Sequence, residues 1–226
     1  MAKIAGLGQR ALVEAVGVFF LVFIGAGAVV AAQFAGLGSA SLLAIAFANG
    51  IALALAVSFA MNISGGHINP AVTIAMLVNK AIKPKEAGVY IIFQLIGATI
   101  AGLLLLAAYP AASGAAVNYG TPSLGSGVGI LQGITFEAIM TFILVFTVMG
   151  TAVDKRAPKI AGFGIGLAVF IDVLAGGPFT GAAMNPARWF GPALASGFFT
   201  NWYVYIIGPI VGAVIAAIIY KRLLLK

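Results

Sequence analysis

The sequence contains no cysteine, only five acidic residues and a single histidine. Because there is no thiol, disulfide bonds, thiolate catalysis and cysteine-ligated metal sites are excluded. Charged residues make up 8% of the chain, whereas an average soluble domain has about 25%. With 62% hydrophobic residues and a mean hydropathy of +1.15, the composition excludes an ordinary globular domain and predicts an integral membrane protein.

Basic residues outnumber acidic ones and give a net charge of +7. In a soluble protein this charge would suggest nucleic-acid binding, but here the basic residues lie in short segments between apolar runs, where membrane topology explains them. We therefore expect no nucleic-acid partner. We also expect no cleavable signal peptide, because the apolar run after Lys3 and Arg10 is too long for one.

The apolar runs are continuous, which predicts helices, because the strands of a membrane barrel would alternate apolar and polar residues. Six of the runs are long enough to cross a bilayer. They cover roughly residues 11–32, 42–61, 87–108, 130–153, 160–174 and 202–220. The uncharged segment 110–127 separates the first three runs from the last three and predicts a loop. We expect one all-α membrane domain over residues 1–226.

Two shorter segments share one pattern, which is a glycine-containing approach, an Asn-Pro-Ala triplet and an apolar stretch. The triplets are Asn69-Pro70-Ala71 and Asn185-Pro186-Ala187. Asn is a favoured N-cap and Pro is favoured at the first helical position, so each triplet predicts the start of a helix. A helix of about ten residues is about 15 Å long, half the thickness of the hydrocarbon core. Two such half-helices would cross the bilayer if they met end to end at its middle.

The two halves of the chain repeat this organisation. Glu14 begins one span and Glu137 begins another, and the two triplets are separated by a similar length of chain. Each half has three spans, an odd number, so the halves, roughly residues 1–109 and 128–226, must enter the membrane in opposite orientations. Inverted repeats of this kind place a site at their interface, near the middle of the bilayer.

The basic residues fall on one side of this predicted topology, with a single exception. The positive-inside rule makes that side cytoplasmic, together with both termini. The residues on it are Lys3, Arg10, Lys80, Lys83, Lys85, Lys155, Arg156, Lys159, Lys221, Arg222 and Lys226. The exception, Arg188, lies within the membrane region, and the loops on the other side carry no basic residue.

The segments Ile63–Thr73 and Leu174–Gly181, together with the two triplets, resemble the aquaporin (major intrinsic protein) family, in particular its plant vacuolar and archaeal branches. The resemblance covers nearly the whole chain. It implies six transmembrane helices and two re-entrant half-helices arranged as an inverted repeat. It also implies a passive channel for water that extends to small neutral solutes such as ammonia, urea and glycerol and excludes protons and ions. The expected assembly is a homotetramer in the lipid of the cell membrane, without cofactor or metal.

Arg188 follows Asn185 by three residues, at the positive end of the predicted half-helix. A charged residue in the membrane costs at least about 2.5–3.5 kcal/mol, so it is usually functional. One interpretation is a snorkelling side chain tied to backbone carbonyls. We favour the other, a donor at a pore constriction that repels cations, which is the known arrangement in aquaporin-type pores.

Asn69 and Asn185 are expected to act as N-caps and as pore donors. The side-chain oxygen would accept backbone N–H groups, which leaves the amide NH₂ free to donate to permeating water. The resemblance implies that a water molecule accepting from both amides is held with its own hydrogens pointing outward. Together with the two converging helix dipoles, this arrangement disfavours an excess proton at the midplane.

Glu14 and Glu137 are carboxylates at equivalent places in the two halves. As a proton-relay pair they would indicate a transporter. Their symmetric placement favours a structural role instead, in which each accepts backbone N–H groups of the irregular segment before a half-helix. His67 has no second His and no Cys near it, so we expect a neutral, hydrogen-bonded lining residue rather than a metal ligand.

The family's outer filter has four positions, which correspond here to Asn49, Val173, Ala182 and Arg188. Only Arg188 matches the water-specific pattern, which has an aromatic residue in place of Asn49 and His in place of Val173. The glycerol pattern, with Trp and Phe and with Asp after the Arg, is not matched because Trp189 follows Arg188. We therefore expect a wider, amphipathic filter in which the Asn49 amide can donate and accept. Asp172 would reach the filter only if the register were shifted by one residue.

Two other classes of protein fit part of the pattern. A proton- or ion-coupled secondary transporter can have inverted repeats and broken helices, but it needs a titratable coupling residue that faces its substrate. A membrane enzyme would need a nucleophile–base pair or a metal cluster, and neither is visible in the sequence. A channel is therefore the predicted function.

Overall fold

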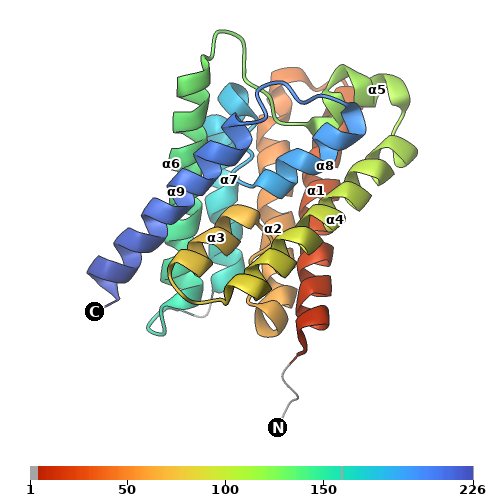
Figure 1. Cartoon of the computed structure of the whole chain (residues 1–226). Coiled ribbons are helices and arrows are strands. Elements are labelled where there is room, and N and C mark those ends of the chain that lie inside the picture. The colour runs from red at the N-terminus through yellow and green to blue at the C-terminus, as the bar shows by residue number, and fades with distance from the viewer. Residues whose placement is uncertain (1–4, 159, 226) are drawn as a thin grey trace.

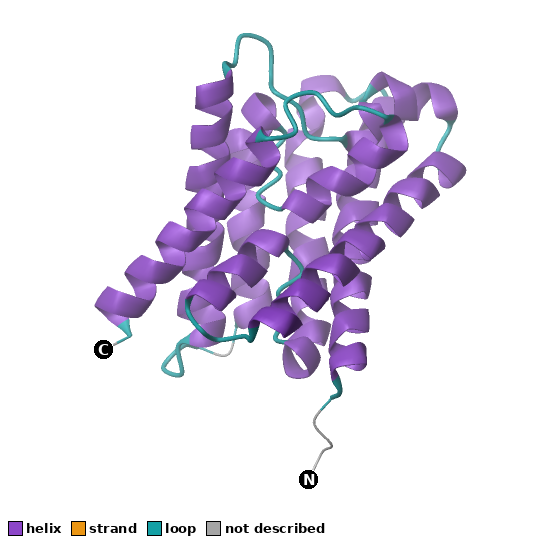
Figure 2. Ribbon diagram, viewed as in Figure 1, coloured by secondary structure: helices purple, strands orange, loops and turns teal. Residues whose placement is uncertain are grey.

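The computed structural model describes residues 5–158 and 160–225, and this part of the chain folds into a bundle of helices without strands (Figure 1, Figure 2). Six of the helices are long and apolar enough to cross a membrane. They are α1 (Leu7–Phe34), α2 (Leu42–Ser64), α4 (Pro84–Ala108), α6 (Ile130–Val148), α7 (Ala161–Thr180) and α9 (Val204–Ile219). α6 and α9 each continue into a π-helical turn, η3 (Met149–Val153) and η4 (Tyr220–Leu224). A short 3₁₀ helix, η1 (Gly38–Ser41), leads into α2.

Two shorter helices, α3 (Pro70–Val78) and α8 (Pro186–Ser196), correspond to the predicted half-helices. In Figure 1, α3 lies in the lower half of the bundle and α8 in the upper half. Their 9 and 11 residues span only about 14 and 17 Å at 1.5 Å per residue, so neither crosses a bilayer alone. The predicted architecture of six spans and two half-helices is confirmed, and the chain is a multi-pass membrane protein.

The helices pack in two matching sets. α1 packs against α2 and α4, and in the same way α6 packs against α7 and α9. α8 lies against α4, and its counterpart α3 lies against α9, so each half-helix contacts a long helix from the other half of the chain. α2 and α7 pack against each other. The two halves are therefore interlocked around the half-helices rather than folded as separate bundles.

Small residues bring the long helices close together at equivalent places in the two sets. A Cβ at Gly97 of α4 would overlap the backbone carbonyl of Ala15 in α1. A Cβ at Gly212 of α9 would overlap the backbone carbonyl of Ala138 in α6. Such contacts are typical of membrane helices, which associate through close van der Waals packing because lipid tails are as apolar as their own side chains.

Two segments differ from the sequence-based expectation. α7 continues to Thr180 instead of ending near residue 174, although it contains Pro178. A proline removes a single helical hydrogen bond, whereas an irregular segment in an apolar environment would leave several backbone groups unpaired. The expected loop over 110–127 contains a short helix, α5 (Ala111–Ala116), and a 3₁₀ turn, η2 (Asn118–Gly120). The Gly, Ser and Pro residues of this segment are typical of a loop, so the sequence did not predict these short helices.

The start of α1 and the end of η4 lie at the same end of the bundle as the α3–α4 and α6–α7 connections (Figure 1). These are the segments that contain the basic residues, so the structure gathers the charges at one end. Three of the residues predicted to lie there, Lys3, Lys159 and Lys226, are outside the described residues. The connection between α4 and α6 lies at the opposite end.

Hydrogen bonds between an ion pair in the α6–α7 connection and η4 hold these two segments together. Arg156 Nη2 donates to Asp154 Oδ2 at 2.6 Å and to the carbonyl of Leu224 at 2.7 Å. Tyr220 Oη also donates to Asp154 Oδ2, at 3.2 Å. The hydrogen bonds from the Arg156 guanidinium hold the pKa of Asp154 below its usual value, so the carboxylate stays charged at neutral pH.

Single cysteines can test which end faces the cytoplasm, because the chain has no thiol of its own. We expect Ser126→Cys, at an exposed position between α4 and α6, to react with a membrane-impermeant maleimide on intact bacterial cells that express the protein. Lys155→Cys, exposed in the α6–α7 connection, should react only after the cells are permeabilised, because it lies with the basic residues. The reverse labelling pattern would contradict the topology.

Candidate functional site

Each half-helix begins with an asparagine that caps it. Asn69 Oδ1 accepts a hydrogen bond from the backbone N–H of Ala71 at 2.8 Å, and Pro70 is the first residue of α3. Asn185 Oδ1 accepts from the backbone N–H groups of Ala187 at 3.0 Å and Arg188 at 3.3 Å. The following Pro186 is the first residue of α8. Both asparagines thus satisfy N–H groups that a helix start would leave unpaired.

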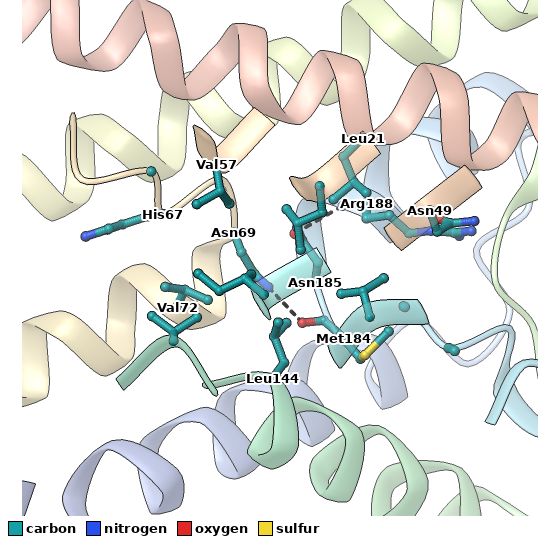
Figure 3. Close-up of a pocket in the computed structure, with 17 residues that line it drawn as sticks. Leu21, Asn49, Val57, His67, Asn69, Val72, Leu144, Met184, Asn185 and Arg188 are labelled. Atoms are coloured by element: carbon teal, nitrogen blue, oxygen red, sulfur yellow. Dashed lines mark hydrogen bonds between the residues drawn. The ribbon is translucent and has the colours of Figure 1, made fainter. Parts of the chain in front are cut away.

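The two caps are also cross-linked to each other's segments. Asn69 Nδ2 donates to the carbonyl of Met184 at 2.9 Å, a bond that Figure 3 shows as a dashed line. Asn185 Nδ2 donates to the carbonyl of Ile68 at 2.9 Å. An amide NH₂ has two hydrogens, so one is used and one remains for the cavity. The expectation that both hydrogens of each amide are free is therefore wrong, because one hydrogen of each amide is used in the structure.

The segments in front of the two half-helices have the same unusual backbone. The residues that follow α2 and α7 are Gly65 and Gly181, both in the left-handed region with φ of 94° and 77°. Ile68 and Met184, directly before the asparagines, are left-handed as well, with φ of 53° and 52°. This conformation costs a residue with a side chain roughly 1–2 kcal/mol. It also takes the backbone N–H groups out of any helix, so they need other acceptors.

Glu14 supplies those acceptors to the first segment. Its Oε1 accepts from Ser64 Oγ at 2.6 Å and from the backbone N–H of His67 at 2.9 Å. Its Oε2 accepts from the backbone N–H of Ile68 at 2.5 Å and from Gln94 Nε2 at 2.7 Å. The carboxylate is fully buried, and four hydrogen bonds replace the water that the membrane interior does not provide.

Glu137 does the same for the second segment from α6. Its Oε1 accepts from Thr180 Oγ1 at 2.7 Å and from the backbone N–H of Ala183 at 2.9 Å. Its Oε2 accepts from the backbone N–H of Met184 at 2.7 Å. Glu137 is also fully buried. Because an unpaired buried donor costs about 1–3 kcal/mol, these three hydrogen bonds fix the segment in front of α8.

The sequence did not reveal a third pair of supporting residues, Tyr90 and Tyr205. Tyr90 Oη donates to the carbonyl of Ser64 at 2.8 Å, and Tyr205 Oη donates to the carbonyl of Thr180 at 3.0 Å. Both tyrosines are fully buried. Their separation in the sequence is almost the same as that of the two asparagines, and this spacing is the signal that could have identified them.

A narrow cavity, called the central cavity below, lies at the tips of α3 and α8 (Figure 3). Its volume is about 20 Å³, which is room for one or two water molecules at about 10–15 Å³ each. Most of its wall is apolar, and the polar side chains in it are Asn49, His67, Asn69, Asn185 and Arg188.

His67 lies in the wall of the central cavity next to the first half-helix. Its Nδ1 is 3.1 Å from Thr73 Oγ1, and its ring meets the ring of Tyr90 edge to face with centroids 5.3 Å apart. These contacts, together with the hydrogen bond from its backbone to Glu14, hold the ring in place.

Arg188 lies in the first turn of α8 and is buried. Its Nη1 donates to the carbonyl of Gly120 at 3.1 Å, so η2 in the connection between α4 and α6 positions the guanidinium. Its buried Nε has no hydrogen-bond partner among the residues that the structure describes. An unpaired charged donor in a buried cavity is costly, so this group favours a polar occupant.

The four expected filter positions do not all lie in one cavity. Asn49, Ala182 and Arg188 line the central cavity. Val173 lines an adjoining outer cavity of about 390 Å³, which also has Arg188 in its wall. Asp172 is in the lining of neither cavity, and its buried Oδ2 has no partner within 5–158 and 160–225. The residue of α7 that faces the approach to Arg188 is thus Val173 and not Asp172.

Glu137→Ala should strongly destabilise the protein. It leaves the Thr180 hydroxyl and the N–H groups of Ala183 and Met184 without an acceptor, at about 1–3 kcal/mol each. Thermal unfolding of the detergent-solubilised protein, followed by size-exclusion chromatography, measures the loss. Glu86→Gln, which removes a partly exposed ion pair with Arg10, is the control and should change the unfolding temperature little. A Glu137→Ala protein as stable as the unmodified one would refute the supporting role.

Comparison with known proteins gives consistent matches along the chain. The family model described as "Major intrinsic protein" matches residues 2–220. Aquaporin TIP4-4 of Zea mays is 42% identical in an alignment 229 residues long, which covers 98% of this chain and 89% of that protein. Probable aquaporin TIP1-2 of Oryza sativa subsp. japonica is 44% identical over 219 residues, covering 94% and 85%.

A solved structure, the aquaglyceroporin from Plasmodium falciparum, has the same fold. It superimposes with a TM-score of 0.87 over 96% of this chain and 97% of that chain, at 23% sequence identity. The family model spans nearly the whole sequence, and the relatives named as aquaporins share about two fifths of their residues with it. The chain therefore belongs to the major intrinsic protein family, whose members include the aquaporins.

Proposed function

We propose that the protein is a passive channel that conducts water in single file and also admits small neutral solutes such as ammonia, urea and glycerol. The observation that carries this proposal is the central cavity, which lies between two opposed helix N-termini and has room for one or two water molecules. The relatives named as aquaporins and the solved aquaglyceroporin support it.

The free hydrogens of Asn69 and Asn185 act as the donors at the centre of the path. A water molecule that accepts from both amides has its own hydrogens directed away from them, so it cannot accept a proton from one neighbour and pass it to the other. The N-termini of α3 and α8 each contribute a partial charge of about +0.5. Together with Arg188, they exclude protons and cations from the cavity.

The filter that we propose consists of Asn49, Val173, Ala182 and Arg188. Arg188 supplies the donors, whereas Val173 and Ala182 form an apolar wall on the approach to it. Val173 provides neither a second polar partner nor the bulk of an aromatic or imidazole ring. Selectivity among neutral solutes depends on pore width and on the groups that can pair with them, so this filter rejects solutes larger than water only weakly.

A coupled transporter is not favoured. Such a protein needs a titratable group that faces its substrate, but the carboxylates of Glu14 and Glu137 are surrounded by donors that already use their oxygens. Catalysis is not favoured either, because the major intrinsic proteins are channel proteins and not enzymes.

We further propose one domain built from inverted repeats of roughly residues 1–109 and 128–226, supported by the matching helix contacts. The gathering of basic residues at one end supports cytoplasmic termini. The cell membrane is the expected location, whereas the TIP relatives are of the plant vacuolar type and favour a vacuolar membrane. Fractionation of the source cells decides between these two membranes.

Stopped-flow measurements on proteoliposomes test the channel function. We expect water permeability well above that of empty vesicles, with a low activation energy and no dependence on a proton gradient. Val173→His should narrow the filter, so it should lower urea and glycerol permeability about tenfold and water permeability less than about threefold. Val173→Leu, which changes bulk but adds no polar group, is the matched control. Water permeability equal to that of empty vesicles would refute the channel. If Val173→His has the same urea and glycerol permeabilities as the unmodified protein, the filter assignment is wrong.

We also propose a homotetramer with one pore in each subunit. The support is family membership together with the exposed apolar side chains along the outer faces of the long helices, such as Phe20, Phe47 and Ile171. Native mass spectrometry in several mild detergents should show four chains in each particle. Monomers in all of them would contradict the tetramer without affecting the channel.

A further inference from the structure

The N–H groups of the Asn49 amide do not donate into the central cavity, although the residue lies in the cavity wall. Its Nδ2 donates to the carbonyl of Ile45 at 2.8 Å and to the carbonyl of Gly25 at 3.4 Å. These bonds use both hydrogens of the amide. The side chain is thus folded back onto α2 and α1, and only 2% of the residue is exposed. The expectation that Asn49 donates to permeating solutes needs correction.

Gly25 in α1 makes room for this orientation. A Cβ at residue 25 would overlap Oδ1 of Asn49 and would lie 2.9 Å from its Cγ and 3.4 Å from its Nδ2. Any residue larger than glycine at this position is therefore incompatible with the observed Asn49 side chain. The effect is local to the amide, because the three atoms nearest to the added Cβ all belong to Asn49.

α2 cannot move away to relieve such an overlap. Gly50, the neighbour of Asn49, already lies against α7, where a Cβ would be 2.7 Å from the carbonyl of Gly166 and 2.8 Å from Cβ of Phe170. Interiors packed this closely respond to an added methyl group by moving side chains to other rotamers. The space open to a displaced Asn49 side chain is the central cavity that it lines together with Arg188.

We propose that Gly25 is a specificity-determining residue of the channel. Because it has no side chain, the Asn49 amide lies against α1 and does not narrow the passage beside Arg188, which joins the outer cavity to the central cavity. Asn49 then contributes width to the filter, and the donors at this level come from Arg188. This inference rests on the proposed channel function and deepens it by naming the contact that sets the upper size of the solute.

The first test is Gly25→Ala in reconstituted vesicles. The methyl group should push the amide of Asn49 into the cavity and lower urea and glycerol permeability about tenfold, with a change of less than about threefold for water. The matched control is Gly8→Ala in the same helix, where an added Cβ has no neighbour within 4 Å. It should leave every permeability unchanged. A crystal or cryo-EM structure of Gly25→Ala should show the Asn49 amide turned toward Arg188.

The second test removes the side chain of Asn49, which the added methyl group would overlap. In an Asn49→Ala background, Gly25→Ala should change neither the ratio of glycerol to water permeability nor the apparent melting temperature. This comparison remains decisive if Gly25→Ala alone folds poorly, because the double variant has no amide to overlap. Equal narrowing with and without Asn49 would overturn the inference, as would an unmodified channel that passes water but neither urea nor glycerol. Failure of the unmodified protein to pass water would instead refute the channel function, and the inference with it.

Discussion

The structure depends on the hydrogen bonds that two buried carboxylates accept from the segments in front of the half-helices. Each segment leaves a long helix through a left-handed glycine and turns back into the bundle, so its N–H groups belong to no helix. In the membrane interior such groups cost several kcal/mol if they stay unpaired. Glu14 and Glu137 supply acceptors from neighbouring long helices and so fix the tips of α3 and α8.

Everything at the central cavity follows from that placement. With the tips fixed, each asparagine reaches the carbonyl in front of the opposite half-helix. The two positive helix ends then face each other across a space with room for one or two water molecules. The halves differ in the first turn of their half-helices. Arg188 has the place in α8 that Val72 has in α3, so the charged residue that we propose for the filter lies on one side of the centre only.

Much of the fold could be predicted because membrane constraints leave strong traces in a sequence. Long apolar runs, two Asn-Pro-Ala triplets and one-sided charge give the six spans, the half-helices and the clustering of basic loops. The helical continuation of α7 through Pro178 could not be read in the same way. Its residues are typical of a loop, but the membrane makes unpaired backbone groups more costly than one lost hydrogen bond.

The site was predictable to the level of residues but not of contacts. The triplets, Arg188 and the paired glutamates stand out through spacing and chemistry. The role of Tyr90 and Tyr205 is visible only when the two halves are overlaid, because a buried tyrosine has many uses in a helix. The orientation of Asn49 depends on the absence of a side chain at Gly25 in another helix, and no local pattern encodes such a contact.

The central claim is that water passes through the cavity between the two asparagines. A structure determined at a resolution that shows ordered water tests it most directly. The account predicts a single file of water molecules through the central cavity, with one of them within hydrogen-bond distance of both Asn69 Nδ2 and Asn185 Nδ2. A file of water that bypasses these amides, or a dry cavity in a protein that conducts water, would contradict it.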